Sequence, residues 1–382
     1  MCKLYSCILF NHSISSTISD DSTFKSFKPF QPFLTKQPNK RINIPRMTLD
    51  KNKILELEQM IAKAEKITLC THTSPDADTI GSALALQNVL LQMNKKVKLV
   101  CPNVAPDFLS WMPSIDSILV HDKQGKAVHE AVLEADLLFA MDFNAPHRTA
   151  NVEKVMKDST ATKVLIDHHL FPDEDYFDLM FSFPHKSSTS ELLFDILYNS
   201  NFKKYINKEI ATNIFVGLMT DTGSFAYSCD QPETFETAAK LIRYGVKVKE
   251  THDIVFNNNS IDRLRILGLG INDNLHVFAD KKAAYIAFSA EELNQFGDKE
   301  GLTEGIVNYA LSIKGICFAA LLTEKDDKIK MSFRSKKEFN VNEFARNNFE
   351  GGGHHNAAGG KSFLSLKDTQ AKLEKLISEF DI

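Results

Sequence analysis

Short, mostly apolar runs alternate with amphipathic stretches in the first two thirds of the chain. The apolar runs lie at 66–72, 97–101, 136–142 and 163–169. Stretches with the helical spacing of apolar residues lie between or after them, at 79–93, 145–157, 187–200, 207–219 and 232–244. Continuous apolar strands separated by helices are typical of a parallel sheet that is covered on both faces. We therefore predict an α/β fold with a parallel sheet in this part of the chain.

The pattern changes near residue 261, where a charged helical stretch begins. After it the sequence predicts a pair of strands, two further strands, a glycine-rich run and a terminal helix, at 275–288, 316–324, 328–335, 350–360 and 366–380. We therefore predict two domains, at 47–260 and 275–382, with a helical linker at 261–274 between them. The second domain is the smaller one and is also α/β.

Length and composition are those of an ordinary globular chain of two domains, with 382 residues, 43% hydrophobic and 25% charged. The formal net charge of −4 excludes a broad basic face for long nucleic acid, but not a pocket for a small phosphorylated ligand. The six cysteines form no CxxC pair, which indicates free thiols in a reducing compartment. No apolar run approaches the roughly 18 residues of a membrane span. We expect a cytoplasmic protein that does not contact membranes.

The first 46 residues differ from the rest of the chain in charge. They hold seven basic and two acidic residues, a balance of +5, which leaves −9 for the remainder. A basic segment that is rich in Ser and poor in acids has some features of an organelle transit peptide. We favour a disordered leader, or an upstream start codon with Met47 as the functional beginning, because no helical or strand period is sustained there.

Carboxylates and imidazoles gather where the predicted strands of the first domain end. The groups that follow successive strands are His72, Asp76 and Asp78, then Asp142, then Asp167, His168 and His169. Asp221 follows the apolar helix at 207–219. In an open parallel sheet the functional crevice lies beyond the carboxyl ends of the strands, so we expect these side chains to converge. Each alone could be a helix cap, a turn residue or a core histidine, but the set together favours a site.

The predicted site offers nitrogen and oxygen ligands without sulfur. Carboxylates and imidazoles that pack together repel or desolvate one another unless a cation balances them. Such a ligand set suits Mn(II) or Mg(II) better than a thiolate-bound structural Zn(II). There are more ligands than one ion needs. Two ions about 3.5–4 Å apart, bridged by a carboxylate, would use them all and would suit phosphoryl hydrolysis.

These residues give the chain a resemblance to the DHH family of phosphoesterases, named after the Asp-His-His found here at 167–169. Four segments correspond to its metal motifs, HTSPDADTIGS, MDFNAPHR, IDHH and TDTGSF. The run GGGHHNAAGG resembles the signature of the C-terminal domain associated with the family. The match covers roughly residues 50–375. It implies a catalytic domain with a dinuclear metal site, a substrate-binding domain after it, and hydrolysis of a phosphoester.

The resemblance also implies a role for each polar residue of the first domain. One metal ion would be held by His72 and Asp76, the other by Asp78, His168 and Asp221, and Asp142 would bridge the two. His169 would lie beside the scissile phosphate, as an acid or as an electrostatic stabiliser. Asp167 would orient the site from behind the ligands.

Further residues are candidates for binding the phosphates of a substrate. In the second domain these are Arg334, Gly351, Gly352, Gly353 and His354, because an arginine fork and a glycine-rich bend both bind anions. In the first domain they are Ser82, which with Gly81 begins a helix, and Arg148. A surface arginine, a glycine hairpin, a helix cap and a solvated helix residue are the structural alternatives. His185 and His355 have no assigned role.

A single associated domain resembles the short bacterial branch of the family. Its members degrade very short RNA oligonucleotides and pApA to mononucleotides and dephosphorylate adenosine 3',5'-bisphosphate. We therefore expect a short oligonucleotide or a nucleoside bisphosphate as the partner, and no long duplex, because such substrates need a pocket and not a track. The sequence leaves open whether the chain forms a homodimer. The alternatives are a cyclic dinucleotide phosphodiesterase or single-strand DNA exonuclease of the same family, and a catalytically silent nucleotide-binding protein.

Overall fold

The structure is a computed structural model that describes residues 49–227, 229–297, 301–325 and 327–380. The expected leader at 1–46 lies outside these residues. Among the helices of the described ranges, none is both long and apolar enough to cross a membrane.

The first half of the described chain forms a six-stranded parallel sheet, in the order β3-β2-β1-β4-β5-β6. The strands are β1 (Lys66–Cys70), β2 (Lys96–Cys101), β3 (Ile118–Val120), β4 (Leu137–Met141), β5 (Thr162–Asp167) and β6 (Leu179–Ser182). The predicted parallel sheet is therefore confirmed. The sequence did not predict β3 and β6, because strands of three and four residues are too short to show a pattern.

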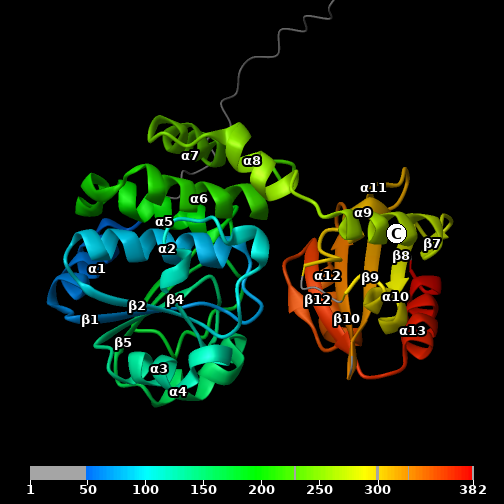
Figure 1. Cartoon of the computed structure of the whole chain (residues 1–382), viewed down its shortest axis with the longest axis horizontal. Helices are drawn as coiled ribbons and strands as arrows, with labels where there is room; N and C mark the ends of the chain where they lie inside the picture. Colours follow the sequence, from blue (N-terminus) through cyan, green and yellow to red (C-terminus); the bar gives the residue numbers. More distant parts are fainter. Residues whose placement is uncertain (1–48, 228, 298–300, 326, 381–382) are drawn as a thin grey trace, which may run out of the picture. The chain divides into compact units, whose positions relative to one another are not determined.

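Helices cover both faces of this sheet (Figure 1). One face packs against α1 (Lys51–Lys63), α2 (Ala77–Gln92), α5 (Thr189–Tyr198) and α6 (Lys208–Asp221). The other packs against α3 (His121–Leu133) and α4 (Glu153–Asp158). Neighbouring strand residues alternate between the two cores, as Leu69 and Cys70 do on β1. Two more helices, α7 (Pro232–Arg243) and α8 (Val248–Phe256), follow α6.

The stretch predicted as one helix at 145–157 is divided. A 3-10 turn covers Pro146–Val152, and α4 begins at Glu153. Ala150 has a φ of 45° and a ψ of −113°, which are not helical angles. The backbone breaks there, and only the second part continues as an α-helix.

The second half forms another six-stranded sheet, in the order β11-β12-β10-β9-β8-β7. Its strands are β7 (Leu275–Phe278), β8 (Ala283–Phe288), β9 (Phe318–Lys325), β10 (Lys328–Ser335), β11 (Gly352–Gly353) and β12 (Ala357–Ser362). Only the β8–β9 pair is parallel. The predicted α/β character of this part is confirmed.

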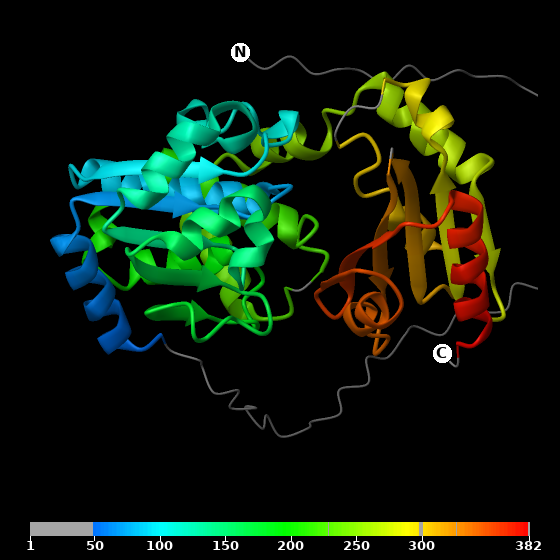
Figure 2. The same ribbon diagram turned by 90° about the horizontal axis from the view of Figure 1, so that it is seen from below.

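Helices lie on both faces of the second sheet as well. One core includes residues of α9 (Ile261–Asn272), α10 (Ala290–Asn294) and α11 (Val307–Ser312), the other residues of α12 (Val341–Asn348) and α13 (Leu366–Ser378). Figure 2 shows α13 in red beside the strands. Ile266 of α9 is fully buried in the first of these cores. The helix in the predicted linker at 261–274 thus packs against this sheet.

Candidate metal centre

The carboxyl ends of three neighbouring strands carry the histidines and aspartates of the site. His72 lies two residues after β1, Asp142 directly after β4, and Asp167 is the last residue of β5. Asp142 has a φ of 65°, a left-handed conformation that is uncommon for residues other than glycine and is found at functional sites. The sheet thus brings together side chains that lie up to 97 positions apart, from His72 to His169.

His72, Asp76 and Asp142 form one group of potential metal ligands. The Nε2 atom of His72 lies 3.8 Å from Oδ2 of Asp76 and 3.6 Å from Oδ2 of Asp142. Its Nδ1 atom donates a hydrogen bond of 2.9 Å to the carbonyl oxygen of Thr73. Because that bond places the proton on Nδ1, the lone pair on Nε2 is free for a metal ion.

Asp78, Asp142 and His168 form a second group. Nε2 of His168 lies 3.9 Å from Oδ2 of Asp78, 3.6 Å from Oδ1 of Asp142 and 3.4 Å from Oδ2 of Asp221. Nδ1 of His168 donates to the carbonyl oxygen of Lys186 at 3.1 Å, so Nε2 is the nitrogen that loses its proton when a metal ion binds. The two oxygens of Asp142 face different groups, since Oδ2 is near His72 and Oδ1 is near His168.

The charges of these side chains show that the site lacks positive charge. Burial raises the pKa of Asp78, and the carboxylates of Asp142 and Asp221 raise it further. Burial also raises the pKa of Asp221 to about 6, although His168 opposes the shift. Burial disfavours the charged form of His168, but Asp221, Asp142 and Asp78 together outweigh it and raise the pKa of His168 to about 10. Buried carboxylates that compete for protons in this way fit a place for divalent cations.

The N-terminus of α5 holds two of the carboxylates. Oδ2 of Asp78 accepts from the backbone N–H of Thr189 at 2.6 Å, and Oδ1 accepts from that of Ser190 at 2.9 Å. The hydroxyl of Thr189 donates to Oδ1 of Asp142 at 2.7 Å. Thr189 and Ser190 were not among the predicted site residues. The signal available was the capping sequence, in which Ser188 accepts from the N–H of Glu191.

A buried ion-pair network supports the segment before α5. The ammonium group of Lys186 lies 2.9 Å from Oε1 of Glu191 and 2.6 Å from Oδ2 of Asp195. The other carboxylate oxygen of Glu191 accepts from the N–H and the hydroxyl of Ser187. Since the carbonyl of Lys186 accepts from His168, this network fixes the position of a potential metal ligand.

His169 lies beside the two groups and makes different contacts. Its Nδ1 atom donates to Oδ1 of the fully buried Asp167 at 2.7 Å. The other oxygen of Asp167 has no hydrogen-bond partner among the described residues. The ring of His354 stacks on His169, with 4.5 Å between the ring centroids. Burial, together with His169 and His168, lowers the pKa of His354, so its imidazole is neutral.

The other candidates from the second domain lie on β10 and β11. Arg334 interacts electrostatically with Asp221 and Glu304, which oppose the lowering of its pKa by burial. Gly352 and Gly353 pair with β12. The N–H of Gly353 donates to Oδ1 of Asn342 at 3.0 Å, so it is not available for an anion.

The glycine run has a packing reason of its own. A Cβ on Gly351 would collide with the carbonyl oxygen of Gly359, and one on Gly353 would lie 2.6 Å from the carbonyl oxygen of Ala357. The run therefore allows two strands to approach closely and brings His354 to its position.

The first-domain candidates Ser82 and Arg148 differ in their burial and in their contacts. Ser82 is fully buried, and its hydroxyl donates to the carbonyl of Asp78 at 2.8 Å. The expectation concerned the N–H groups at the start of a helix, but α2 begins at Ala77, so Ser82 lies inside the helix and its contact with phosphate stays a prediction. Arg148 is half-buried, and its charge has a small effect on His72: burial and Arg148 lower the pKa of His72, but Asp142 and Asp76 outweigh them and raise it. His185 and His355 are exposed.

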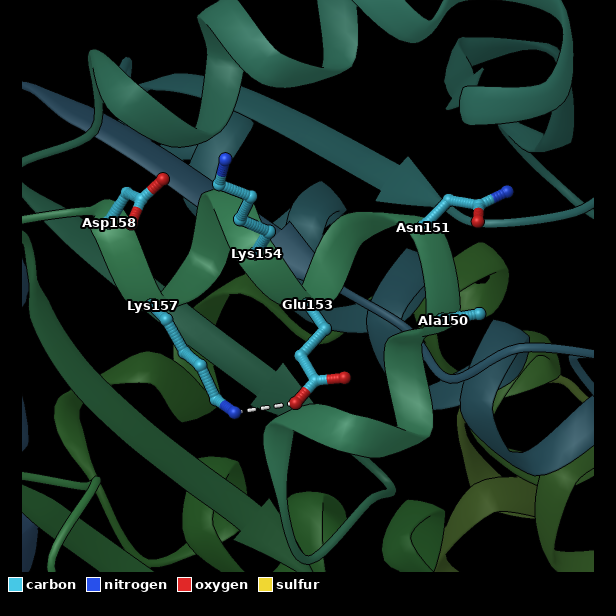
Figure 3. A pocket seen from close by; sticks show the side chains of 6 residues that line it. All are labelled: Ala150, Asn151, Glu153, Lys154, Lys157 and Asp158. Atoms are coloured by element: carbon cyan, nitrogen blue, oxygen red, sulfur yellow. Dashed lines mark hydrogen bonds and ion pairs between the residues drawn. The ribbon is translucent and has the colours of Figure 1, made fainter.

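A cavity on the surface lies outside the candidate metal centre. A cavity of about 440 Å³ is lined by Ala150, Asn151, Glu153, Lys154, Lys157 and Asp158 (Figure 3). The ammonium group of Lys157 pairs with Glu153 at 2.5 Å. The cavity contains no histidine, and its charged groups have both signs, so it does not have the chemistry of the metal centre.

Comparison with known proteins supports the family resemblance. The model of the DHH family, N-terminal domain, matches residues 66–218, and that of the DHHA1 domain matches residues 281–381. The bifunctional oligoribonuclease and PAP phosphatase NrnA of Bacillus subtilis is 28% identical, over 85% of this chain and 99% of that protein. The cyclic-di-AMP phosphodiesterase PdeA of Listeria monocytogenes is 26% identical over 85% of this chain, which spans 49% of that protein.

A solved structure is similar over nearly the same range. The exopolyphosphatase-related protein from Bacteroides fragilis is 35% identical and superposes with a TM-score of 0.83. The match covers 86% of this chain and 96% of that one. The fold of this chain thus has a counterpart in a solved structure.

Proposed function

Because the chain belongs to the DHH family, we propose that it is a metal-dependent phosphoesterase that hydrolyses short RNA oligonucleotides and pApA to mononucleotides. Dephosphorylation of adenosine 3',5'-bisphosphate is a second activity of the same site. The observation that carries the proposal is Asp142, whose two carboxylate oxygens face two separate groups of ligands. The two activities in the name of the Bacillus subtilis relative support the choice of substrates.

The residues present fit two divalent ions, Mn(II) or Mg(II). His72 and Asp76 would hold one ion, Asp78, His168 and Asp221 the other, and Asp142 both. The donor set contains only imidazole nitrogen and carboxylate oxygen, which suits these ions. When bound, the ions would supply an acidified water and neutralise charge on the phosphate.

His169 is the group of this chain best placed to move a proton. Its Nδ1–H bond to Asp167 leaves Nε2 as the atom that faces a ligand. The same hydrogen bond to Asp167 holds the imidazole ring in its orientation. His169 then donates a proton from Nε2 to the oxygen that leaves phosphorus, or stabilises charge there.

Arg334 and His354 bind the remaining phosphate oxygens of a short substrate. Arg334 offers a guanidinium fork, and the neutral His354 offers a ring N–H without adding charge. Arg148, near His72, is a further cation for the same phosphates.

The test is a substrate panel with the purified full-length chain and Mn(II) or Mg(II). It compares di- to pentaribonucleotides, pApA, adenosine 3',5'-bisphosphate, cyclic di-AMP and a long single strand of DNA at equal concentration. We expect mononucleotides from the short RNAs, and loss of this activity in Asp142→Asn. The variant Asp116→Asn, which changes an exposed aspartate elsewhere, serves as the control.

Other results would change the assignment. Preference for the cyclic dinucleotide would favour the activity named for the Listeria monocytogenes relative. Preference for the long strand would contradict a short-substrate site. A wild-type protein that cleaves none of the panel but binds nucleotide tightly would overturn the enzymatic proposal.

A further inference from the structure

Phe171 lies two residues after His169 with its ring open to solvent. The residue is 67% exposed. A single exposed apolar residue is common on protein surfaces and carries no meaning alone. Phe171 follows His169 by only two positions in the chain, however, so its backbone and its neighbours are relevant.

The backbone holds Phe171 in a conformation that this residue type rarely adopts. Its φ is 61°, in the left-handed region that a bulky side chain disfavours. The Nδ2 group of Asn144 donates to the carbonyl of Leu170 at 2.6 Å and to that of Phe171 at 3.3 Å. The carbonyl of Asn144 accepts from the N–H of Asp173 at 2.8 Å. The turn that presents the ring is thus fixed to the loop that follows Asp142, and strain of this kind clusters at functional sites.

A cation lies next to the ring. The guanidinium carbon of Arg346 is 5.5 Å from the ring centroid of Phe171. Nε of Arg346 donates to Oδ1 of Asn342 at 3.2 Å. Within the described ranges, no carboxylate forms an ion pair with Arg346, and the residue is exposed. Its Nη groups are therefore free to bind an anion.

Asn342 of α12 joins this arginine to the glycine run. Oδ1 of Asn342 accepts from both Nε of Arg346 and the N–H of Gly353. A Cβ on Gly352 would lie 3.5 Å from Nε of Arg346, an ordinary contact distance. Arg346 is therefore held beside β11, the strand directly before His354, and His354 stacks on His169.

We propose that Phe171 is a stacking platform for one nucleobase of the substrate and that Arg346 binds the phosphate attached to that nucleoside. This inference rests on the proposed function and specifies how the substrate is recognised. An aromatic face stacks any base, and a free guanidinium beside it suits the phosphate. The pair accounts for preference for a nucleotide over a bare phosphoester, and it requires no contact to a long strand.

The test compares Phe171→Ala with the wild type on pApA and on two analogues, each with one adenine replaced by hydrogen. Stacking energies predict that kcat/KM for pApA falls between about 5-fold and about 150-fold in Phe171→Ala. The loss should persist on one analogue and vanish on the other, because only one base lies on the ring. Phe171→Trp should restore kcat/KM.

Two control variants separate this effect from a general one. Phe363→Ala removes another ring that is 61% exposed, and Arg265→Ala removes a side chain that is 68% exposed. Neither should change kcat/KM. Arg346→Ala should raise KM for pApA, with Arg346→Lys retaining part of the affinity.

A second measurement does not depend on turnover. In Phe171→Trp, titration with pApA in the absence of metal should quench the added tryptophan fluorescence, after subtraction of the wild-type signal from Trp111. If the wild type cleaves pApA but Phe171→Ala matches it on all three substrates and no quenching occurs, the platform is wrong. If the wild type cleaves none of them and quenching still occurs, the proposed function fails while the platform stands.

Discussion

Asp167 and His169 are two positions apart in the sequence, but they are placed differently in the site. Asp167 is fully buried at the end of β5, whereas His169 has 13% of its side chain exposed. The bond of 2.7 Å between them fixes which nitrogen of His169 faces the ligand groups. Asp167 thus acts through His169, a positioning role that differs from that of Asp142.

The variant Asp167→Asn tests this division of roles. It keeps the shape of the side chain but weakens the acceptor that fixes the tautomer and orientation of His169, so kcat should fall by about 10²-fold or more while KM changes little. The Mn(II) content of the purified variant, measured by mass spectrometry of the metal, should equal that of the wild type. Loss of one equivalent of metal would show instead that Asp167 is a ligand.

For single residues, the sequence predicted well which side chains gather in the site. It predicted poorly which contacts those side chains make. The eight histidines and aspartates of the first domain do gather at the strand ends, as expected from topology. The predicted start of the helix near Gly81 and Ser82 was wrong, because α2 already begins at Ala77 after the capping residue Asp76. Thr189 was missed because its hydroxyl meets Asp142 from 47 positions away.

The helices α2, α5 and α6 meet at one small residue. Gly217 of α6 lies where a Cβ would be 2.7 Å from Oδ1 of Asp78 and would collide with the hydroxyl of Ser190. Both of those residues belong to the hydrogen bonds by which α5 holds Asp78. The close packing of these helices therefore determines the position of a proposed metal ligand.

Gly217→Ala should for this reason disturb the site as well as the core. Overpacking predicts that the free energy of unfolding falls by about 1–3 kcal/mol, and the affinity for Mn(II) should fall by about 10- to 100-fold. Chemical denaturation and a metal titration measure the two effects. Gly268→Ala is the matched control, since a Cβ there meets nothing within 4 Å and should stabilise α9 by up to about 1 kcal/mol. Equal metal affinity in both variants would contradict the expectation.

The first domain of the molecule holds a group of buried carboxylates, and these outnumber the cationic side chains beside them. Burial raises the pKa of Asp78 and Asp221, which means that folding without metal is opposed by desolvation of their charges. Bound ions would remove that cost. Metal binding and global stability are therefore coupled.

Removal of metal should lower the melting temperature of the full chain, and Mn(II) should raise it. At 100 times the dissociation constant, one bound ion adds about 2.7 kcal/mol to the free energy of unfolding. Calorimetry with EDTA and with Mn(II) measures the shift, and Asp142→Asn should lose most of it. An unchanged shift in that variant would place the stabilising ion elsewhere.

From the sequence alone one can predict the two α/β parts, the parallel first sheet and the residues of the candidate centre. These follow from local patterns: apolar runs of strand length, helical spacing between them, and polar residues where each strand ends. The motif order carried the family resemblance for the same reason. Neither the short strands β3 and β6 nor the break at Ala150 had such a pattern.

The groups that support those residues could be found only in the folded chain. The contacts of Thr189 with Asp142, of Lys186 with His168, and of Arg346 with Phe171 join segments far apart in the chain. A side chain's partners across such distances depend on how helices and strands pack, which one sequence does not encode locally. The residues proposed to bind metal could therefore be read in advance, whereas the groups that orient them and the proposed platform for a base required the fold.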